Sequence, residues 1–305
     1  MLHPIYAFKE SGITTEYNST LALEAVRGFL ATVPRGKEIY QRGIVRMCCE
    51  LYREALAGSD CLYFLDKTPR YYFVIRELTE LFPNARFVFL LRNPMAVLVS
   101  VVKTWVKDNP FLLREYKSDL LLAPANLVGG IEELSANAIV VHFEQLVQQP
   151  EAELRRLCAY LRLEFEPEML KYASRDLPRW EYGDQVTIYQ AAAPLTTRNE
   201  AWIDALDNPK IWRFVSDYKS ALGARIIEAM GYSIQAIQRA LDARQPPRWK
   251  LYPTFGLGDV LEQDDERFHF DLRKIVAQKM SMIQKRGIRH FLLRPHRLLI
   301  RKKPS

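Results

Sequence analysis

RFVFLLRNPMAVLVS, at residues 86–100, is the stretch of sequence that decides the fold. Residues 86–91 form an apolar run of strand length, and Asn93-Pro94 follows with a helix N-cap residue and a proline at the first helical position. The pattern predicts a buried strand over 86–91 and a helix that runs to about Val106. A buried strand that leads directly into a helix is the repeating unit of a parallel sheet covered by helices.

The sequence on either side repeats this pattern. CLYFL at residues 61–65 is a second apolar run of strand length, and Thr68-Pro69 predicts the start of a helix that ends at Phe82. Other segments predict a strand over residues 138–142 and helices over 20–33, 37–57, 112–134 with an interruption near Pro124, 150–161 and 210–243. We therefore expect an α/β fold built on a parallel sheet.

The composition is that of a soluble globular protein, with 49% hydrophobic and 26% charged residues in a chain of 305. The four cysteines show no metal-ligand spacing, and so few of them in a long chain indicate free thiols in a reducing compartment. The sequence contains neither an apolar run long enough to span a membrane nor a secretory signal pattern. We expect a cytoplasmic protein.

The net charge of +7 is concentrated near the C-terminus. Residues 272–305 contain eleven Lys and Arg and no Asp or Glu, and the preceding residues carry a small acidic excess. We expect a globular body over residues 1–245 and a basic extension over 246–305. The basic and bulky apolar residues of this extension favour an anionic membrane surface, which would make the protein membrane-peripheral, or an acidic polymer; the alternative is a solvated tail. Nucleic acid is not expected as a partner, because the basic residues that bind it usually lie on one face of a folded domain.

Candidate ligand-binding residues follow the predicted strands, because open parallel sheets bind ligands at the carboxyl ends of their strands. Arg92 precedes the helix that Asn93 caps, and a helix N-terminus favours phosphate or sulfate. A guanidinium can hold such an anion with two hydrogen bonds. Ser100 lies two turns further on the same side of the helix. These residues predict an oxyanion site; the alternative is a surface arginine and a helix serine without a ligand.

Lys67 follows the predicted strand at residues 61–65 in the same way. An ammonium group at this position suits the neutralisation of charge on a transferring group. The alternative is a solvated lysine paired with Asp66 or Glu77.

In combination, these motifs resemble sulfotransferases that use 3′-phosphoadenosine 5′-phosphosulfate. The resemblance extends over roughly residues 1–235 and lies in four motifs, DKTPRY at 66–71, LLRNP at 90–94 with Ser100, VVHFEQLV at 140–147 with Pro150-Glu151, and FEPEML at 165–170. It implies a P-loop NTPase-like, three-layer parallel sheet with flanking helices, and chemistry that needs no metal.

The resemblance also implies roles for individual residues. Arg92 and Ser100 would bind the 3′-phosphate of the nucleotide, with Asn93 at the start of the same helix, and Lys67 would lie near the sulfuryl group. The aromatic segment 180–185, with Arg198 and Trp202, resembles the loop that closes over the nucleotide, where an aromatic ring would stack on adenine. Core packing is the alternative role for the tryptophans.

One family feature is not matched. Members begin with a strand and a Gly-rich loop of the form PRSGTT, whose backbone amides hold the 5′-phosphosulfate. Here Gly12-Ile-Thr-Thr15 is only faintly similar and follows no predicted strand. We expect the first strand and its loop to be missing, either because the natural start lies upstream or because the chain is degenerate. The sequence gives no clear catalytic base; Glu10 and Glu16 are candidates, with solvated carboxylates as the alternative.

Three functions fit these features. The first is an enzyme that moves a sulfuryl group from 3′-phosphoadenosine 5′-phosphosulfate to a hydroxyl of a carbohydrate or glycolipid. The second is a non-catalytic sulfotransferase remnant that binds the nucleotide or an anionic surface. The third is a nucleotide kinase-like enzyme, against which the absence of GxxxxGK[ST] counts.

Overall fold

The computed structural model describes residues 19–107, 109–134, 137–171, 199–247, 250–251 and 256–258. They fall into two compact units that divide between Ala85 and Arg86. Several predicted features lie outside the described residues, namely Glu10, Gly12–Thr15, Glu16, the segment 180–185, Arg198 and the basic residues 272–305. The predicted boundary at residue 245 therefore stays a prediction.

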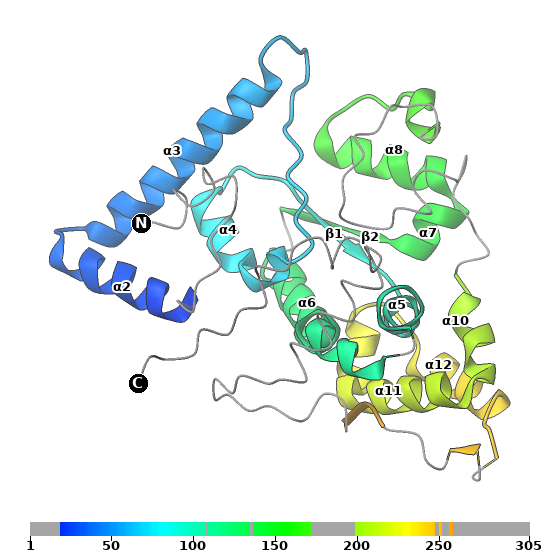
Figure 1. Cartoon of the computed structure of the whole chain (residues 1–305). Helices are drawn as coiled ribbons and strands as arrows, with labels where there is room; N and C mark the ends of the chain where they lie inside the picture. The colour runs from blue at the N-terminus through cyan, green and yellow to red at the C-terminus, as the bar shows by residue number, and fades with distance from the viewer. Residues whose placement is uncertain are drawn as a thin grey trace, which may run out of the picture. The chain divides into compact units, whose positions relative to one another are not determined.

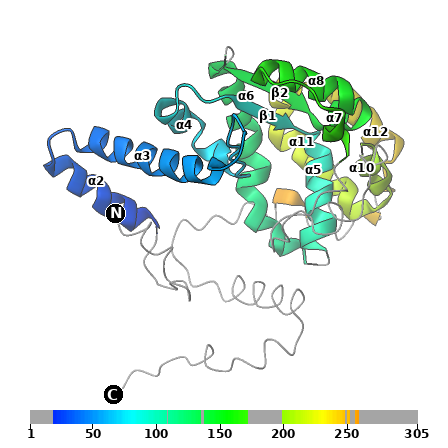
Figure 2. The same ribbon diagram turned by 90° about the horizontal axis from the view of Figure 1, so that it is seen from above.

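The N-terminal unit begins with two long helices, α2 (Ser19–Thr32) and α3 (Gly36–Leu56), which confirm the helices predicted over 20–33 and 37–57 (Figure 1). Figure 2 shows the tight connection between them. Gly36 is required at this connection, because a Cβ atom there would come within 2.2 Å of the Leu30 carbonyl oxygen. The helix pair is therefore closed by a contact that only glycine permits.

The strand predicted over residues 61–65 is wrong. These residues have no regular secondary structure, and Leu62 and Leu65 are 76% and 82% exposed. The described part of this unit contains no strand that could pair with them, and an apolar run becomes a strand only when a neighbour satisfies its backbone groups.

The helix start predicted at Thr68-Pro69 is also wrong. A 3₁₀ turn, η1 (Tyr71–Phe73), comes first, and the α-helix α4 (Ile75–Leu81) begins two residues later. The Thr68 hydroxyl makes no cap at either element and points instead to Asp66, with an oxygen–oxygen distance of 3.5 Å.

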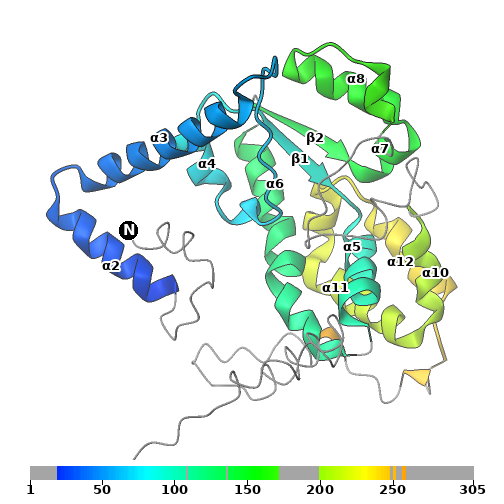
Figure 3. The same ribbon diagram turned by 45° about the horizontal axis from the view of Figure 1, so that its top comes forward.

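The C-terminal unit contains a parallel pair of strands, β1 (Phe87–Leu91) and β2 (Ala138–His142). Their register runs from Phe87 opposite Ala138 to Leu91 opposite His142. Figure 3 shows the two strands running in the same direction, with α6 and α11 on one side and α7 and α8 on the other. The strands predicted over 86–91 and 138–142 and the α/β class with a parallel sheet are confirmed.

Most of the remaining chain is helical. The elements after β1 are α5 (Pro94–Val101), a π-helix η2 (Val102–Val106), a 3₁₀ helix η3 (Pro110–Tyr116), a π-helix η4 (Ser118–Leu122) and α6 (Ala123–Glu133). The elements after β2 are α7 (Phe143–Gln148), α8 (Pro150–Leu161), η5 (Pro167–Leu170), α10 (Ala201–Asp204), η7 (Ala205–Asp207), α11 (Pro209–Ala229) and α12 (Ile234–Ala243).

These elements confirm the helix predicted over 150–161 and refine two others. The segment 112–134 is divided among 3₁₀, π and α geometry, with Pro124 in the first turn of α6. The segment 210–243 is split into α11 and α12 by a turn at Gly231, whose φ of +87° lies in the left-handed region.

Helix α5 lies in the main hydrophobic core of this unit. Met95 and Leu98 are fully buried, together with Leu113, Phe214 and Tyr218 of neighbouring elements. Trp202 packs into the same cluster, so core packing is its role in the structure. Because α5 is held by this core, its first turn has a fixed position at the carboxyl end of β1.

Two further properties concern the whole of the described chain. No helix that the structure describes is both long and apolar enough to cross a membrane. The four cysteines, all of which are described, are free thiols.

Candidate anion-binding site

The predicted oxyanion site lies where β1 ends and α5 begins. Asn93 caps the helix as predicted, because its side-chain oxygen accepts a hydrogen bond of 2.9 Å from the Met95 N–H. The Asn93 N–H donates to Glu144 Oε1 over 2.9 Å, and Pro94 carries no N–H. The first turn therefore has fewer free N–H groups than a helix N-terminus usually offers to an anion.

Arg92 is half-buried and lies between the strand and this helix. Its guanidinium covers the ring of Phe143, with 4.5 Å between Cζ and the ring centroid. Stacking on an aromatic face restricts the orientation of the guanidinium. The backbone donors of the first turn are largely used, and Arg92 brings a positive charge to the strand end.

Ser100 lies near the end of α5 and is half-buried. The structure thus brings Arg92, Asn93 and Ser100 onto one continuous strand–turn–helix segment, as the sequence predicted. Both neighbours of Ser100 along the helix are apolar, and Val99 is buried in the core. The hydroxyl is therefore carried by a helix whose orientation the core determines.

Lys67 belongs to the N-terminal unit and is exposed. Its neighbour Asp66 accepts hydrogen bonds from the Tyr52 and Tyr71 hydroxyls, at 2.5 Å and 2.7 Å. Phe64 stacks on Tyr52 with 4.3 Å between the ring centroids. No ion pair involves Lys67 within the described chain, so the pairing with Asp66 or Glu77 considered as an alternative is not present in this structure.

The two tyrosines beside Asp66 hold their protons tightly. Burial raises the pKa of the Tyr52 hydroxyl above its ordinary value, and the hydrogen bond to the Asp66 carboxylate raises it further. Burial raises the pKa of Tyr71, a hydrogen bond with the Thr68 side chain opposes this rise, and the same carboxylate adds to it. Asp66 is thus an acceptor between two neutral donors and anchors the backbone next to Lys67.

Glu144 is a contact residue whose role the sequence did not predict. Its Oε1 accepts the Asn93 N–H, and its Oε2 accepts a hydrogen bond of 2.7 Å from the Tyr232 hydroxyl. Burial and the Glu144 carboxylate raise the pKa of Tyr232, and the positive charge of Arg92 opposes this effect. The position of Glu144 just after β2 was a usable signal, but Tyr232 lies 88 residues away and had none.

His142, at the end of β2, makes contacts with the turn before α12. Its Nε2 lies 3.0 Å from the Met230 carbonyl oxygen, and its ring meets the edge of Tyr232 with 5.7 Å between the centroids. Gly231 permits this contact, since a Cβ atom there would lie 2.7 Å from His142 Nε2.

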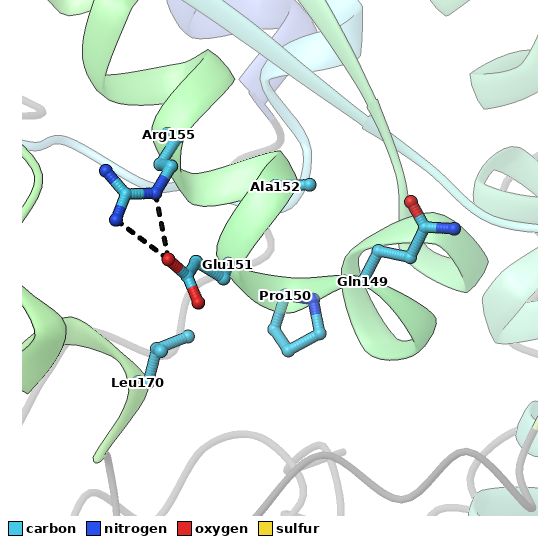
Figure 4. A pocket seen from close by; sticks show the side chains of 6 residues that line it. All are labelled: Gln149, Pro150, Glu151, Ala152, Arg155 and Leu170. Atoms are coloured by element: carbon cyan, nitrogen blue, oxygen red, sulfur yellow. Dashed lines mark hydrogen bonds and ion pairs between the residues drawn. The ribbon is translucent and has the colours of Figure 1, made fainter.

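A pocket elsewhere in this unit does not suit an anion. A pocket of about 540 Å³ lies at the start of α8 (Figure 4). Both Arg155 N–H groups that face it donate to Glu151 Oε1, at 2.9 Å and 2.8 Å, and the first turn also contains Glu153. The acidic first turn would repel a phosphate. Within the described residues, no group of three or more His, Cys, Asp or Glu side chains is placed to hold a metal ion.

Comparison with protein families assigns this architecture to a class. A model described as the sulfotransferase family matches residues 15–167, which is half of the chain. The chain therefore belongs to the sulfotransferase family. The match includes Lys67, Arg92, Asn93, Ser100 and Glu144 and ends before Arg198.

Individual relatives are distant. Nodulation protein NoeE of Sinorhizobium fredii is 29% identical over 221 residues, which cover 63% of this chain and 49% of NoeE. Protein-tyrosine sulfotransferase A of Caenorhabditis elegans is 27% identical over 99 residues, covering 31% of this chain and 26% of that protein. The chain thus spans about half of the first relative and less of the second.

Among solved structures, the sulfotransferase domain from the curacin biosynthetic pathway is similar with a TM-score of 0.38 and 20% identity. The similarity covers 52% of this chain and 60% of that domain.

Proposed function

We propose that this chain transfers a sulfuryl group from 3′-phosphoadenosine 5′-phosphosulfate to a hydroxyl group. The observation that supports this most directly is Arg92, stacked on Phe143 at the carboxyl end of β1 and followed at once by the capped helix α5. In a member of the sulfotransferase family, this is the expected position for the 3′-phosphate of the donor.

In this proposal the 3′-phosphate is bound mainly by side chains. Arg92 provides the charge and two hydrogen bonds, Ser100 provides a hydroxyl, and the dipole of α5 adds attraction. Asn93 shapes the turn through its cap and does not itself offer its N–H, which Glu144 holds. Arg198 is proposed as a further nucleotide-binding residue from the family resemblance alone.

Lys67 is proposed to act on the transferring group. The acceptor oxygen attacks sulfur, the bond between sulfur and the bridging phosphate oxygen breaks, and its electron pair leaves with 3′-phosphoadenosine 5′-phosphate. An ammonium near that oxygen stabilises the negative charge that develops there. The exposure of Lys67 and the engagement of Asp66 by two tyrosines support this role, because the ammonium is not neutralised by its nearest carboxylate. None of the described residues is assigned to the 5′-phosphosulfate or to the base that accepts the hydroxyl proton.

The acceptor is proposed to be a carbohydrate or glycolipid. The Lys67-Thr68-Pro69 motif, which resembles carbohydrate sulfotransferases, supports this class. The similarity to protein-tyrosine sulfotransferases supports a tyrosine hydroxyl as the second candidate. We also propose a cytoplasmic location, with the basic C-terminal residues at an anionic membrane surface.

Calorimetry with 3′-phosphoadenosine 5′-phosphate tests the nucleotide site. The substitution Arg92→Ala should weaken nucleotide binding about 10- to 100-fold, because charge-assisted hydrogen bonds to the phosphate are lost. Arg155→Ala is a matched control, because Arg155 also stacks on a phenylalanine, with Cζ 4.1 Å from the Phe165 centroid, but lies on α8. Equal affinities of the Arg92 variant and the unmodified protein would refute the site.

Turnover with 3′-phosphoadenosine 5′-phosphosulfate and a panel of sugar, glycolipid and tyrosine acceptors tests the reaction. Lys67→Ala should lower the rate constant roughly 10²- to 10³-fold and leave nucleotide affinity nearly unchanged. Tight nucleotide binding without turnover on any acceptor would favour a non-catalytic binding protein instead. Tighter binding of ATP than of the 3′-phosphorylated nucleotide would favour the kinase-like alternative.

A further inference from the structure

We propose that Glu144 is a positioning residue that holds the Arg92-Asn93 turn and thereby sets the preference for a nucleotide with a 3′-phosphate. This inference rests on the proposed function, because it assigns Arg92 to that phosphate. It concerns a residue that does not itself contact the anion.

Glu144 connects four separate segments of the C-terminal unit. Its two carboxylate oxygens accept the Asn93 N–H and the Tyr232 O–H, at 2.9 Å and 2.7 Å. Its main-chain oxygen accepts a hydrogen bond of 3.3 Å from the Asn199 side chain. The end of β1, the start of α7, the segment before α10 and the turn before α12 therefore meet at one residue.

The contacts of Glu144 continue the pairing of the two strands. Leu91 is opposite His142 in the parallel register, so Arg92 and Asn93 follow one strand as Phe143 and Glu144 follow the other. Phe143 lies under the Arg92 guanidinium, and Glu144 holds the Asn93 N–H. Two consecutive residues after β2 thus support two consecutive residues after β1.

This support restricts the anion in two ways. The carboxylate occupies the Asn93 N–H, so a phosphate must use the side chains of Arg92 and Ser100 instead. A carboxylate at this point also repels an anion that moves away from Arg92 towards the backbone. Glu144 therefore favours one position of the phosphate, and an arrangement held this way keeps its donors in place before the ligand arrives.

Tyr232 keeps the carboxylate oriented. The turn that carries it is fixed by the hydrogen-bond contact between His142 Nε2 and the Met230 carbonyl, across Gly231. The hydroxyl of Tyr232 thus reaches Glu144 from a rigid position. Losing this hydroxyl should loosen Glu144 without removing any charge.

The test measures the ratio of affinities for 3′-phosphoadenosine 5′-phosphate and adenosine 5′-monophosphate, which lacks the 3′-phosphate. Glu144→Ala should lower this ratio about tenfold, and Tyr232→Phe about threefold, because hydrogen bonds that orient the site are lost. Glu144→Gln retains an acceptor for the Asn93 N–H and should keep the ratio within about threefold of the unmodified protein. Tyr218→Phe is the matched control, since its buried hydroxyl donates to the Leu120 carbonyl at 2.6 Å, and it should leave the ratio unchanged.

The outcomes separate this inference from the proposed function. If the unmodified protein binds both nucleotides equally, the 3′-phosphate site itself is wrong, and the role of Glu144 fails with it. If Arg92→Ala abolishes the preference while Glu144→Ala and Tyr232→Phe leave it intact, the nucleotide site stands and the positioning role is overturned. Should Glu144→Ala fail to fold, Tyr232→Phe decides alone, with an unchanged ratio overturning the inference.

Discussion

Residues 86–95 and residues 61–70 carry similar patterns, an apolar run followed by a capping residue and a proline, yet they differ in almost every structural property. The first forms strand β1 and leads into the buried helix α5. The second has no regular structure along its apolar run, and a 3₁₀ turn follows it. Each segment lies in its own unit, and the two differ in what they contact there.

The difference teaches how a strand end becomes a binding site. Leu91 is 2% exposed and packs with Val128 and Met230, so the backbone at Arg92 starts from a fixed point. Next to Lys67, the backbone is anchored by a single carboxylate between Tyr52 and Tyr71. A proposed phosphate site therefore sits on packed secondary structure, and the proposed catalytic lysine sits on an exposed segment with one polar anchor.

Hydrogen exchange should show the largest contrast. Amides of β1 that bond to β2 should exchange at least about 10³-fold more slowly than those of residues 61–65, because exchange in a packed ladder requires opening of the structure. Mass spectrometry of peptides from the two segments measures this. Comparable protection of both would mean that residues 61–65 form a strand in solution.

Truncating one leucine in each segment should separate them next. Leu91→Ala removes a buried side chain and should lower the free energy of unfolding by about 2–5 kcal/mol. Leu65→Ala changes a side chain that is 82% exposed and should stay within about 0.5 kcal/mol. Urea titration of the two variants measures both. A large loss at Leu65 would show that a contact covers it.

The capping residues should differ by a smaller amount. Asn93→Ala deletes the hydrogen bond to the Met95 N–H and should lower the free energy of unfolding by about 1 kcal/mol. Thr68→Ala deletes a hydroxyl that caps nothing and should change it by less than about 0.5 kcal/mol. Thermal unfolding of the two variants, beside the unmodified protein, makes the comparison. Equal losses would mean that Thr68 caps a helix after all.

The smallest effect is expected in the alkaline titration of the tyrosines that anchor the segment next to Lys67. The pKa values of Tyr52 and Tyr71 are raised above the ordinary value of 10.0, so the folded protein binds these protons more tightly than the unfolded chain. Their contribution to stability is complete below pH 10 and is lost as the pH rises above it.

Asp66→Asn removes the negative charge that helps to raise the pKa values of Tyr52 and Tyr71. Ultraviolet absorbance of tyrosinate should then appear at lower pH than in the unmodified protein. The pKa of Tyr218, which burial alone raises, should be the same in both proteins. An unchanged titration curve would contradict the hydrogen bonds assigned to Asp66.

The local sequence pattern was sufficient to predict those helices and strands whose intrinsic preference agrees with their contacts in the folded chain. Helices α2, α3 and α8, both strands and the Asn93 cap were predicted from periodicity and from the Asn-Pro pair. The run at 61–65 was predicted wrongly because strand formation depends on a pairing partner, which a short apolar run does not specify.

The same distinction applies to the site. Arg92, Asn93 and Ser100 lie within nine residues, so a strand–helix pattern places them on one segment. The supports of this segment, Phe143 and Tyr232, come from residues far along the chain, and only the fold brings them to it. No residue pattern signals such a contact in a single sequence.

The close contact between His142 and Gly231 restricts which amino-acid substitutions related proteins can carry at these two positions. With only 2.7 Å between the ring nitrogen and the place of a side chain at 231, any side chain at 231 requires the imidazole to move. Relatives that retain an imidazole at the first position should carry glycine at the second, and a larger residue at 231 should coincide with a smaller one at 142. This paired substitution, across 89 positions of sequence, offers a way to recognise distant members that share the Tyr232 turn.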